Sequence, residues 1–257
     1  MTALASGGVV WITGASSGLG RALALRVVRG GDRVVASARR ADALEDLVTA
    51  AHGQGGKVVS WPLDVTDATA VTEAVAAIER DVGPIDVAVL NAGTHQPILA
   101  RDFAADKVKS LLDLNVMGTA HCLEPLLSRM IGRRRGRIAI VSSVAGYAGL
   151  PTSAGYGASK AGLINMAEAL RPELEALGIT LQIVNPGFVR TPLTDRNPFP
   201  MPFLMEPEAA AEAFYRGLAS DRFEIVFPRR LACLMKLLRL LPHPLFFAVT
   251  RKLVPET

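Results

Sequence analysis

Tyr156 and Lys160 stand four residues apart, and this spacing places both side chains on one face of a helix, one turn apart. A phenol ordinarily keeps its proton up to a pH of about 10, which is too high for acid–base chemistry near neutrality. A neighbouring cation favours the phenolate and lowers the pKa of the phenol. The pair therefore suits a general acid and base whose proton is controlled by the lysine.

A serine hydroxyl can join this pair. Ser143 lies thirteen residues before Tyr156 and follows the apolar run 138–141, which is typical of a buried strand. The end of that strand can bring the hydroxyl against the phenol as a second hydrogen-bond donor. Spacing favours Ser143 over Ser142, because adjacent strand residues point to opposite sides. Tyr and Lys at helical spacing are more often a solvated face, so the rest of the chain must support a catalytic interpretation.

A glycine-rich turn near the N-terminus supplies that support. The apolar stretch 8–13 predicts a strand, and the following glycines open a predicted helix over 18–27. Glycines let the backbone turn sharply and approach a pyrophosphate, whose charge then lies at the helix N-terminus. Glycines alone mark only a tight turn, but a strand before them and a helix after them favour a dinucleotide site. The candidate contacts are Gly14, Ser16, Ser17, Gly18, Leu19 and Gly20.

The end of the second predicted strand, 33–37, indicates which dinucleotide binds. An acidic residue there would accept a hydrogen bond from the free ribose 2′-hydroxyl of NAD. The chain has Arg39 and Arg40 instead, and a guanidinium binds phosphate well. Two cations at the start of a helix are otherwise unfavourable. The 2′-phosphate of NADP(H) is therefore the predicted ligand of these arginines.

Further apolar strands are predicted at 57–61, 85–90, 138–141 and 179–184, with amphipathic helical segments between them. This alternation predicts an α/β fold with a doubly wound parallel sheet, a Rossmann-type three-layer sandwich. We expect residues 1–228 to form a single domain and residues 229–257 to form a basic, apolar C-terminal extension. Pro172 falls inside the helical pattern that follows Lys160, where it removes one helical hydrogen-bond donor.

Composition and spacing argue against several other classes of protein. Cys122 and Cys233 have no C-x-x-C spacing and the four histidines show no ligand pattern, so neither a disulfide framework nor a metal site is expected. The arginine run at 133–137 lacks interleaved aromatic residues, so no nucleic-acid partner is predicted. The N-terminus lacks a basic region followed by an apolar one, which argues against a signal peptide and for a cytoplasmic protein.

The positive net charge of +4 resides in the C-terminal extension, where six Lys and Arg and no acidic residue lie between Ile225 and Pro255. No uncharged apolar run there approaches the roughly 20 residues that span a bilayer. The extension can lie peripherally at a membrane surface, cover an apolar substrate, or pack on the body of the enzyme or a second subunit. In a helix over this segment, one side carries Leu231, Leu234, Met235, Leu238 and Leu241, and the other carries Arg229, Lys236 and Arg239.

In their order along the chain, these motifs resemble those of the short-chain dehydrogenases/reductases over roughly residues 8–192. The resemblance implies hydride transfer between a nicotinamide and a carbonyl or alcohol carbon. The motifs are Thr13-Gly14-x-x-x-Gly18-x-Gly20, Asp64-Val65, Asn91-Ala92-Gly93, Asn115, Ser143, Tyr156-x-x-x-Lys160, and Pro186-Gly187 with Thr191.

The same resemblance implies a role for each catalytic residue. Tyr156 would be the general acid/base, and Lys160 would lower its pKa while holding the nicotinamide ribose. Ser143 would steady the substrate oxygen, and Asn115 would keep a water in a proton relay to Lys160. The implied cofactor contacts are Asp64 with the adenine amino group, Val189 and Thr191 with the carboxamide and pyrophosphate, and Val65, Asn91, Ala92, Gly93, Pro186 and Gly187 along the dinucleotide.

Two departures from the family pattern affect its implications. Ser17 stands where many NADP-using members place a basic residue, so cofactor choice falls to Arg39 and Arg40. Pro172 interrupts a helix that members usually use in dimer packing, although a homo-dimer or homo-tetramer is still the expected assembly.

Apolar side chains around the predicted site favour an apolar substrate that is lipid-, steroid- or acyl-like. Besides Ser143 and Tyr156, the candidate pocket residues are Ala145, Tyr147 and Phe188. The proline-rich loop 192–207 is long for a compact domain and is a candidate lid, with Phe199, Phe203 and Leu204 as possible contacts. These residues can equally belong to the core. A non-catalytic NADP-binding regulatory or scaffold protein of the same fold is the alternative, disfavoured because all four catalytic residues are present.

Overall fold

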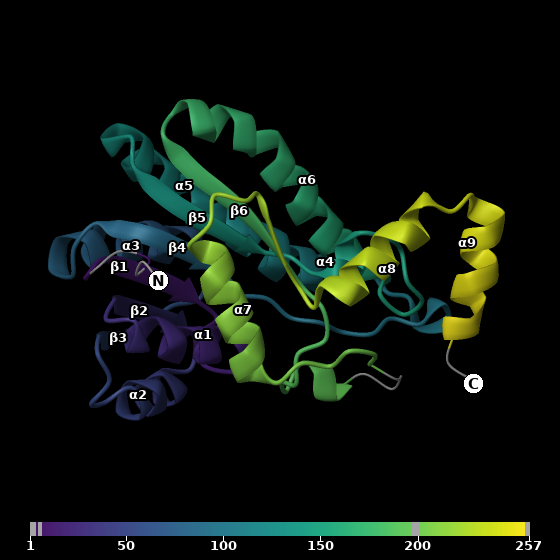
Figure 1. Cartoon of the computed structure of the whole chain (residues 1–257), viewed down its shortest axis with the longest axis horizontal. Coiled ribbons are helices and arrows are strands. Elements are labelled where there is room, and N and C mark those ends of the chain that lie inside the picture. Colours follow the sequence, from purple (N-terminus) through teal and green to yellow (C-terminus); the bar gives the residue numbers. More distant parts are fainter. Residues whose placement is uncertain (1–3, 5–6, 197–200, 255–257) are drawn as a thin grey trace.

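A seven-stranded sheet forms the centre of the molecule in the computed structural model, which describes residue 4 and residues 7–196 and 201–254 (Figure 1). The strand order is β3-β2-β1-β4-β5-β6-β7, and neighbouring strands are parallel. The order reverses between β1 and β4, which creates the kind of switch point where open α/β sheets bind ligands. The strands are β1 (Val9–Thr13), β2 (Arg33–Ala38), β3 (Lys57–Pro62), β4 (Ile85–Leu90), β5 (Gly136–Val141), β6 (Ile179–Pro186) and β7 (Glu224–Phe227).

Helices cover both faces of the sheet and enclose two separate cores. Alternate strand residues point to opposite faces, so that Val10 and Ile12 enter one core while Val9 and Trp11 enter the other. The first core is closed by α1 (Gly18–Arg29), α2 (Ala41–Ala50) and α7 (Pro207–Leu218), and the second by α3 (Ala68–Asp81), α5 (Gly118–Arg133) and α6 (Ala154–Ala176). The predicted doubly wound α/β sandwich is confirmed.

Some boundaries differ from the predicted ones for local reasons. α6 continues through Pro172. Pro172 has no N–H to donate to the carbonyl of residue 168, but both residues are exposed, so water can hydrogen-bond that carbonyl. α4 (Ala105–Leu112) runs into α5 through a π-helical turn at Asp113–Met117. β7 and α7 are absent from the predicted elements, because β7 has only four residues and α7 follows the proline-rich loop.

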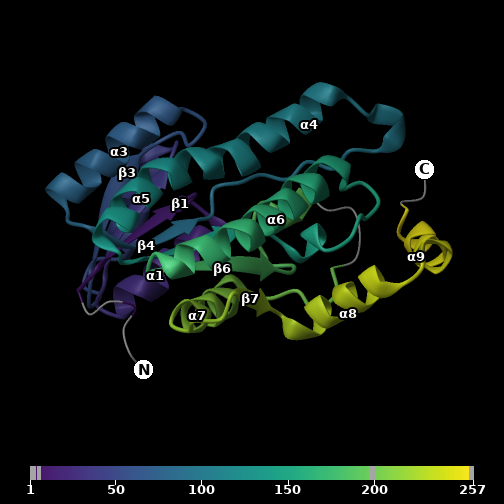
Figure 2. The ribbon, with the colours of Figure 1, turned by 90° about the horizontal axis from the view of Figure 1, so that it is seen from above.

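Two further helices follow β7 and lie at one end of the molecule, α8 (Arg229–Leu240) and α9 (His243–Thr250) (Figure 2). Pro242 separates them as the N-cap residue of α9. Leu231 and Met235 of α8 are buried against Val144 and Ala148, which follow β5. Within the described ranges, no helix is both long and apolar enough to cross a membrane.

A buried hydrogen bond between β1 and β2 gives a test of this sheet. The Trp11 indole N–H donates to the Ser37 hydroxyl at 2.9 Å, and both residues are buried. Ser37→Ala leaves that N–H without an acceptor, so we expect the free energy of unfolding to fall by about 1–3 kcal/mol in urea denaturation.

Ser60→Ala is the matched control on the neighbouring strand. Ser60 is in register with Ala36, and its hydroxyl has no hydrogen-bond partner among the described residues. Removing this hydroxyl should leave the free energy of unfolding unchanged or raise it, since no hydrogen bond is lost. Equal losses in the two variants would show that the indole hydrogen bond does not account for the effect of Ser37→Ala.

Candidate active site

A cavity of 1380 Å³ lies at the carboxyl ends of the strands and is lined by most of the predicted site residues. Its volume exceeds the roughly 300–1,000 Å³ typical of a site for one small ligand, which leaves room for a dinucleotide and a substrate together. Gly14, Asn91 and Ser143 enter it just after β1, β4 and β5, while Pro186 ends β6. The central strands therefore position the chemistry.

The turn between β1 and α1 forms the first wall of the cavity. Gly14 and Gly18 have φ angles of 67° and 55°, in the left-handed region that favours glycine. A Cβ on Gly20 would lie 2.4 Å from the Gly14 carbonyl oxygen and 2.6 Å from Asn91 Nδ2. Asn91 holds the turn, because its Nδ2 donates to the carbonyls of Thr13 and Gly14 at 3.0 and 3.2 Å.

The N-terminus of α1 faces this cavity and can receive an anion. Its N-cap residue Ser17 makes no side-chain capping hydrogen bond, and the first turn contains no acidic residue. Ser16, Ser17, Gly18, Leu19 and Gly20 all line the cavity. The first backbone N–H groups of a helix have no partner within the helix, and the helix dipole favours negative charge there. The cradle fits the pyrophosphate of a dinucleotide.

Arg39 and Arg40 line the cavity beyond β2, next to Asp64, which follows β3. Both arginines are exposed, and neither forms an ion pair with another described residue. Partial burial raises the pKa of Asp64, but hydrogen bonds from Thr66 and the nearby Arg39 outweigh it, so the net pKa shift is downward. The site thus offers two cations and an ionised carboxylate to the adenosine end of a nucleotide.

Tyr156, Lys160 and Ser143 meet on another wall of the same cavity. α6 carries Tyr156 and Lys160 one turn apart, with Lys160 Nζ 5.7 Å from the centre of the Tyr156 ring. Ser143 caps a short 3-10 turn after β5, where its hydroxyl accepts a hydrogen bond from the Ala145 N–H at 3.1 Å. Lys160 Nζ donates to the Val141 carbonyl at 2.9 Å, which ties the helix to the end of β5.

Burial sets the protonation of this group. It raises the pKa of the Tyr156 phenol above its ordinary value, and the Ser143 hydroxyl opposes this only in part. Burial also lowers the pKa of Lys160 to about 8. The direction is therefore opposite to the predicted lowering of the tyrosine pKa, because loss of water around the phenol outweighs the hydrogen bond with Ser143. A phenol with a raised pKa keeps its proton at neutral pH and can act as an acid.

Asn115 lies beneath the cavity in the π-helical turn and is fully buried. Its Nδ2 donates to the Thr94 carbonyl at 3.0 Å and to the Ser159 hydroxyl at 2.9 Å, while its Oδ1 accepts from the Thr94 N–H at 2.8 Å. A Cβ on Gly93 would lie 3.0 Å from Asn115 Oδ1 and 3.5 Å from Lys160 Nζ. Asn115 thus supports the floor of the site, and its water relay to Lys160 stays a prediction.

Three residues outside the predicted set also build the site. The buried His95 ring lies edge-on to the Tyr156 ring, with centroids 4.6 Å apart, and lines the cavity. Ser142 donates to the Lys160 carbonyl and Ser159 to the Tyr156 carbonyl, each at 2.7 Å. A lone serine or histidine carries no signal in a sequence. Only the position of His95 just after Asn91-Ala92-Gly93 could have pointed to it.

The remaining end of the cavity is apolar and is built largely by the C-terminal helices. Of the α8 face predicted as apolar, Leu231, Leu234, Met235 and Leu238 line the cavity, and Leu234 is also 54% exposed. Ala145 and Phe188 line the cavity, together with Leu150 and Pro151. The wall from the C-terminal segment comprises Leu231, Leu234, Met235, Leu238, Val249, Lys252, Leu253 and Val254.

Other predicted pocket residues lie elsewhere. The structure does not bring Tyr147 to the cavity, because its hydroxyl donates to Glu224 and its ring packs against α8. In the candidate lid 192–207, Phe203 and Leu204 do not line the cavity, and Phe199 falls outside the described residues. The loop residues that do line it are Pro192, Leu193, Thr194, Met201 and Pro202. The other predicted cofactor contacts at the cavity are Val65, Ala92, Gly93, Gly187, Val189 and Thr191.

Comparison with known proteins places this geometry in context. A family model described as short chain dehydrogenase matches residues 8–198. An uncharacterized oxidoreductase from Myxococcus xanthus (strain DK1622) is 42% identical over 242 residues, covering 94% of this chain and 96% of the relative.

Two solved structures share the fold. A short-chain dehydrogenase from Sphingobium yanoikuyae in complex with NADPH has a TM-score of 0.78 at 27% identity, covering 88% of this chain and 92% of that one. A short chain dehydrogenase/reductase SDR from Burkholderia phymatum in complex with NAD has a TM-score of 0.84 at 24% identity, covering 92% and 94%, a likeness of fold alone.

Because Lys160 is buried, we expect the difference in stability between the wild type and a variant without this charge to depend on pH. Its pKa in the folded protein, about 8, lies below the ordinary 10.5, so below pH 8 the folded state holds a desolvated charge. Lys160→Met removes that charge, and we expect the variant to be more stable than wild type at pH 7 by on the order of 1–3 kcal/mol. As pH rises from 8 toward 10.5, wild-type Lys160 loses its proton on folding and the gap should shrink.

Urea denaturation of both proteins between pH 7 and pH 10 measures this gap. Lys57→Met is the control, since Lys57 is exposed at the start of β3 and its removal should open no gap that varies with pH. A constant gap for Lys160→Met across this range would contradict a lysine pKa near 8.

Proposed function

The chain belongs to the short-chain dehydrogenase family of oxidoreductases, and we propose that it is an NADP(H)-dependent enzyme that interconverts a carbonyl and a secondary alcohol on an apolar substrate. One observation supports this most directly. The half-buried Tyr156, whose phenol has a raised pKa, lies with Ser143 and Lys160 on one cavity, which has an anion cradle on one side and an apolar wall on the other.

In the proposed reaction, a bound nicotinamide supplies hydride to the carbonyl carbon. Tyr156 donates its phenolic proton to the carbonyl oxygen, since its raised pKa keeps that proton in place near neutral pH. The Ser143 hydroxyl donates a hydrogen bond to the same oxygen and fixes its direction. Lys160, with a pKa of about 8, is mostly charged at pH 7 and balances the phenolate that remains. The protonated phenol is the form of Tyr156 that serves reduction, and the phenolate is the form that serves oxidation.

The proposed preference for NADP(H) rests on the end of β2. The strand ends at Ser37 and Ala38, and Arg39 and Arg40 follow at the cavity without an acidic residue between them. Their freedom from ion pairs with other described residues leaves both guanidinium groups available to a 2′-phosphate. In this proposal, Asp64, which lines the same part of the cavity, accepts a hydrogen bond from the adenine amino group.

Domain organisation, location and assembly belong to the same proposal. Residues 1–228 form the family domain, and the segment from residue 229 on supplies one wall of the substrate site. We place the enzyme in the cytoplasm as a homo-dimer or homo-tetramer, and the exposed side chains of Phe103, Leu112 and Met117 support the assembly. Leu237 and Leu240, 62% and 78% exposed on α8, support a peripheral membrane contact. Light scattering tests the proposed assembly, and vesicle co-sedimentation tests the proposed membrane contact.

A nucleotide-binding scaffold without turnover is the alternative function. The positions of the catalytic side chains weigh against it, because a scaffold has no need for a tyrosine, a lysine and a serine gathered on one cavity of this size. NADPH oxidation across a panel of ketones, aldehydes and 3-oxoacyl thioesters tests the choice. Consumption of NADPH with at least one carbonyl class supports the enzyme, and its absence with bound NADPH supports the scaffold.

Tyr156→Phe tests the acid–base role. The substitution keeps the ring against His95 but removes the transferable proton, so we expect kcat to fall by at least about 10²–10⁴-fold. NADPH affinity, measured by fluorescence titration, should change little because the phenol does not bind the phosphates. A variant with kcat near that of wild type would exclude Tyr156 as the proton donor.

Arg39→Ala tests the cofactor preference. Losing a charge-assisted contact with the 2′-phosphate should lower kcat/KM for NADPH by roughly 10- to 100-fold and leave kcat/KM for NADH nearly unchanged. Arg29→Ala is the control, since Arg29 ends α1 as an exposed cation away from the cavity. If the NADPH/NADH ratio is the same in wild type and Arg39→Ala, Arg39 does not select the cofactor.

A further inference from the structure

We propose that Lys252 forms an anion-binding subsite at the far, apolar end of the cavity. The substrate is then an amphiphile with its carbonyl at Tyr156, an apolar body along α8, and a carboxylate or phosphate at Lys252. This proposal rests on the proposed reductase function and names the substrate class that the same site accepts.

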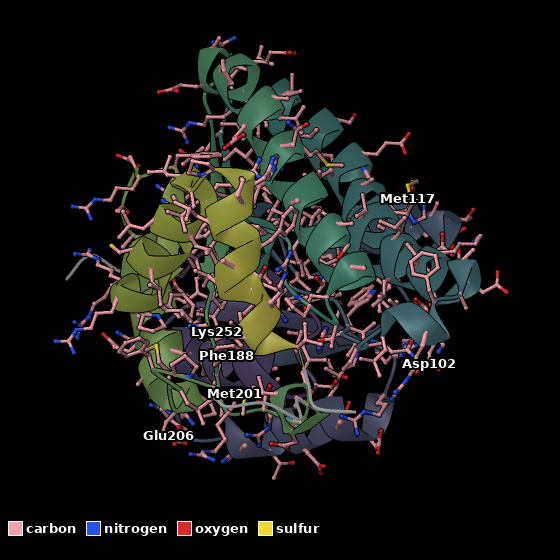
Figure 3. All side chains as sticks on the ribbon, turned by 90° about the vertical axis from the view of Figure 1, so that its right-hand side faces the viewer. Asp102, Met117, Phe188, Met201, Glu206 and Lys252 are labelled. Atoms are coloured by element: carbon pink, nitrogen blue, oxygen red, sulfur yellow. The ribbon has the colours of Figure 1, made fainter. Side chains whose placement is uncertain are left out.

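The position of Lys252 is the first observation in its favour. It lies in a 3-10 turn, Arg251–Leu253, directly after α9, and lines the cavity with Val249, Leu253 and Val254. Figure 3 looks onto this end of the molecule, with α9 in front and Lys252 at its C-terminal end over Phe188 and Met201, two further lining residues. The cation therefore stands at the cavity on an element far along the chain from the catalytic helix.

The distribution of charge around the cavity is the second observation. Among the described residues that line the cavity, the charged side chains are Arg39, Arg40, Asp64, Lys160 and Lys252. The first three lie at the cofactor end and Lys160 lies beside Tyr156. Lys252 is thus the one charge that the described residues place at the apolar end, and its neighbours there are leucine, methionine and valine side chains.

Lys252 also has no counter-charge within the part of the chain that the structure describes. It takes part in none of the ion pairs there, and no acidic residue lies between Ile225 and Pro255. Lys252 is exposed, so its ammonium group is hydrated, and an apolar ligand that filled this end would remove part of that water without a compensating partner among the described residues. A ligand with an anionic oxygen there gains a charge-assisted hydrogen bond.

Lys236, in the same C-terminal segment, is a lysine with a structural role and serves as a comparison. Its ammonium group pairs with Glu224 and lies 5.2 Å from the centre of the Tyr147 ring. Asn185 Nδ2 donates to the same carboxylate at 2.8 Å. These contacts hold α8 against the end of the sheet, so Lys236 is committed to the fold. Lys252 has no such contacts among the described residues, which leaves it for a ligand.

A matched pair of substrates tests the subsite. The probes are an oxo fatty acid with its ketone near the methyl end and the methyl ester of the same acid. Wild-type enzyme should show a KM for the acid about 5- to 30-fold below that for the ester. Lys252→Ala should raise the KM for the acid by that factor, with kcat unchanged, and leave the ester within about twofold. Equal KM values for acid and ester in wild type would overturn the subsite.

Arg251→Ala is the matched control, because Arg251 is the adjacent exposed cation and does not line the cavity. It removes the same charge and should leave both KM values unchanged. Equal effects of the two variants on the acid would overturn the subsite and assign the effect to the general positive charge of the segment. The subsite is also overturned if Lys252→Ala lowers co-sedimentation with anionic phosphatidylserine vesicles while the KM for the acid stays unchanged.

A second pair of probes distinguishes a carboxylate from a phosphate as the group that binds Lys252. A 3-oxoacyl thioester of pantetheine 4′-phosphate carries a phosphate remote from the ketone, and the same thioester of pantetheine does not. If Lys252→Ala raises the KM of the phosphorylated thioester by a larger factor than the KM of the oxo acid, phosphate is the preferred group at Lys252, and the reverse order identifies carboxylate. Insensitivity of all four probes to the substitution would overturn the proposal.

Failure of the subsite is separable from failure of the reductase function. Turnover of the neutral ester by wild type reports the reaction without Lys252. If no probe is reduced, calorimetry still tests the subsite through binding of the hydroxy acid and its ester. Tighter binding of the acid to wild type, lost in Lys252→Ala and kept in Arg251→Ala, supports the subsite, and equal binding of acid and ester overturns it.

Discussion

The loss of water around Tyr156 and Lys160 is the constraint on which the rest of the site depends. Lys160 is buried and Tyr156 is half-buried, and the loss of water moves the pKa of each toward its neutral form. Hydrogen bonds within the protein hold the two side chains in place. One of them runs from Lys160 Nζ to the Val141 carbonyl. Behind these, Ser159 links the backbone of Tyr156 to Asn115 in the π-helical turn. The acid is therefore held by a layer of short polar side chains and not by a single neighbour.

α8 forms an apolar wall of the cavity that these two side chains line. α8 is anchored at the start of β7 by Glu224, whose carboxylate accepts hydrogen bonds from Tyr147, Asn185 and Lys236. Its apolar side then closes the cavity through Leu231 and Met235. The opposite end of the cavity has the reverse character, with glycines, a helix N-terminus and two arginines. One end is thus suited to a polyanion and the other to an apolar body, with the proton donor between them.

Much of this could be predicted because parallel strands covered on both faces are continuous apolar runs. Ile85–Leu90 stands out for that reason, whereas the four-residue β7 does not. Spacing also predicted the shared helix face of Tyr156 and Lys160. The direction of the tyrosine pKa was not predictable, because it depends on burial by elements distant in sequence. Tyr147 was misplaced for a related reason, since its partner Glu224 lies 77 residues downstream. His95 has no signal in the sequence apart from its place after Asn91-Ala92-Gly93.

Hydride transfer itself is the most direct measurement of the central claim. NADPH deuterated at the nicotinamide C4 would be incubated with wild-type enzyme and a ketone that the enzyme consumes, and the alcohol analysed by mass spectrometry. The proposed function predicts one deuterium on the former carbonyl carbon when the label is on the transferred face, and none when it is on the other face. Absence of deuterium from the alcohol with either labelled cofactor would contradict it.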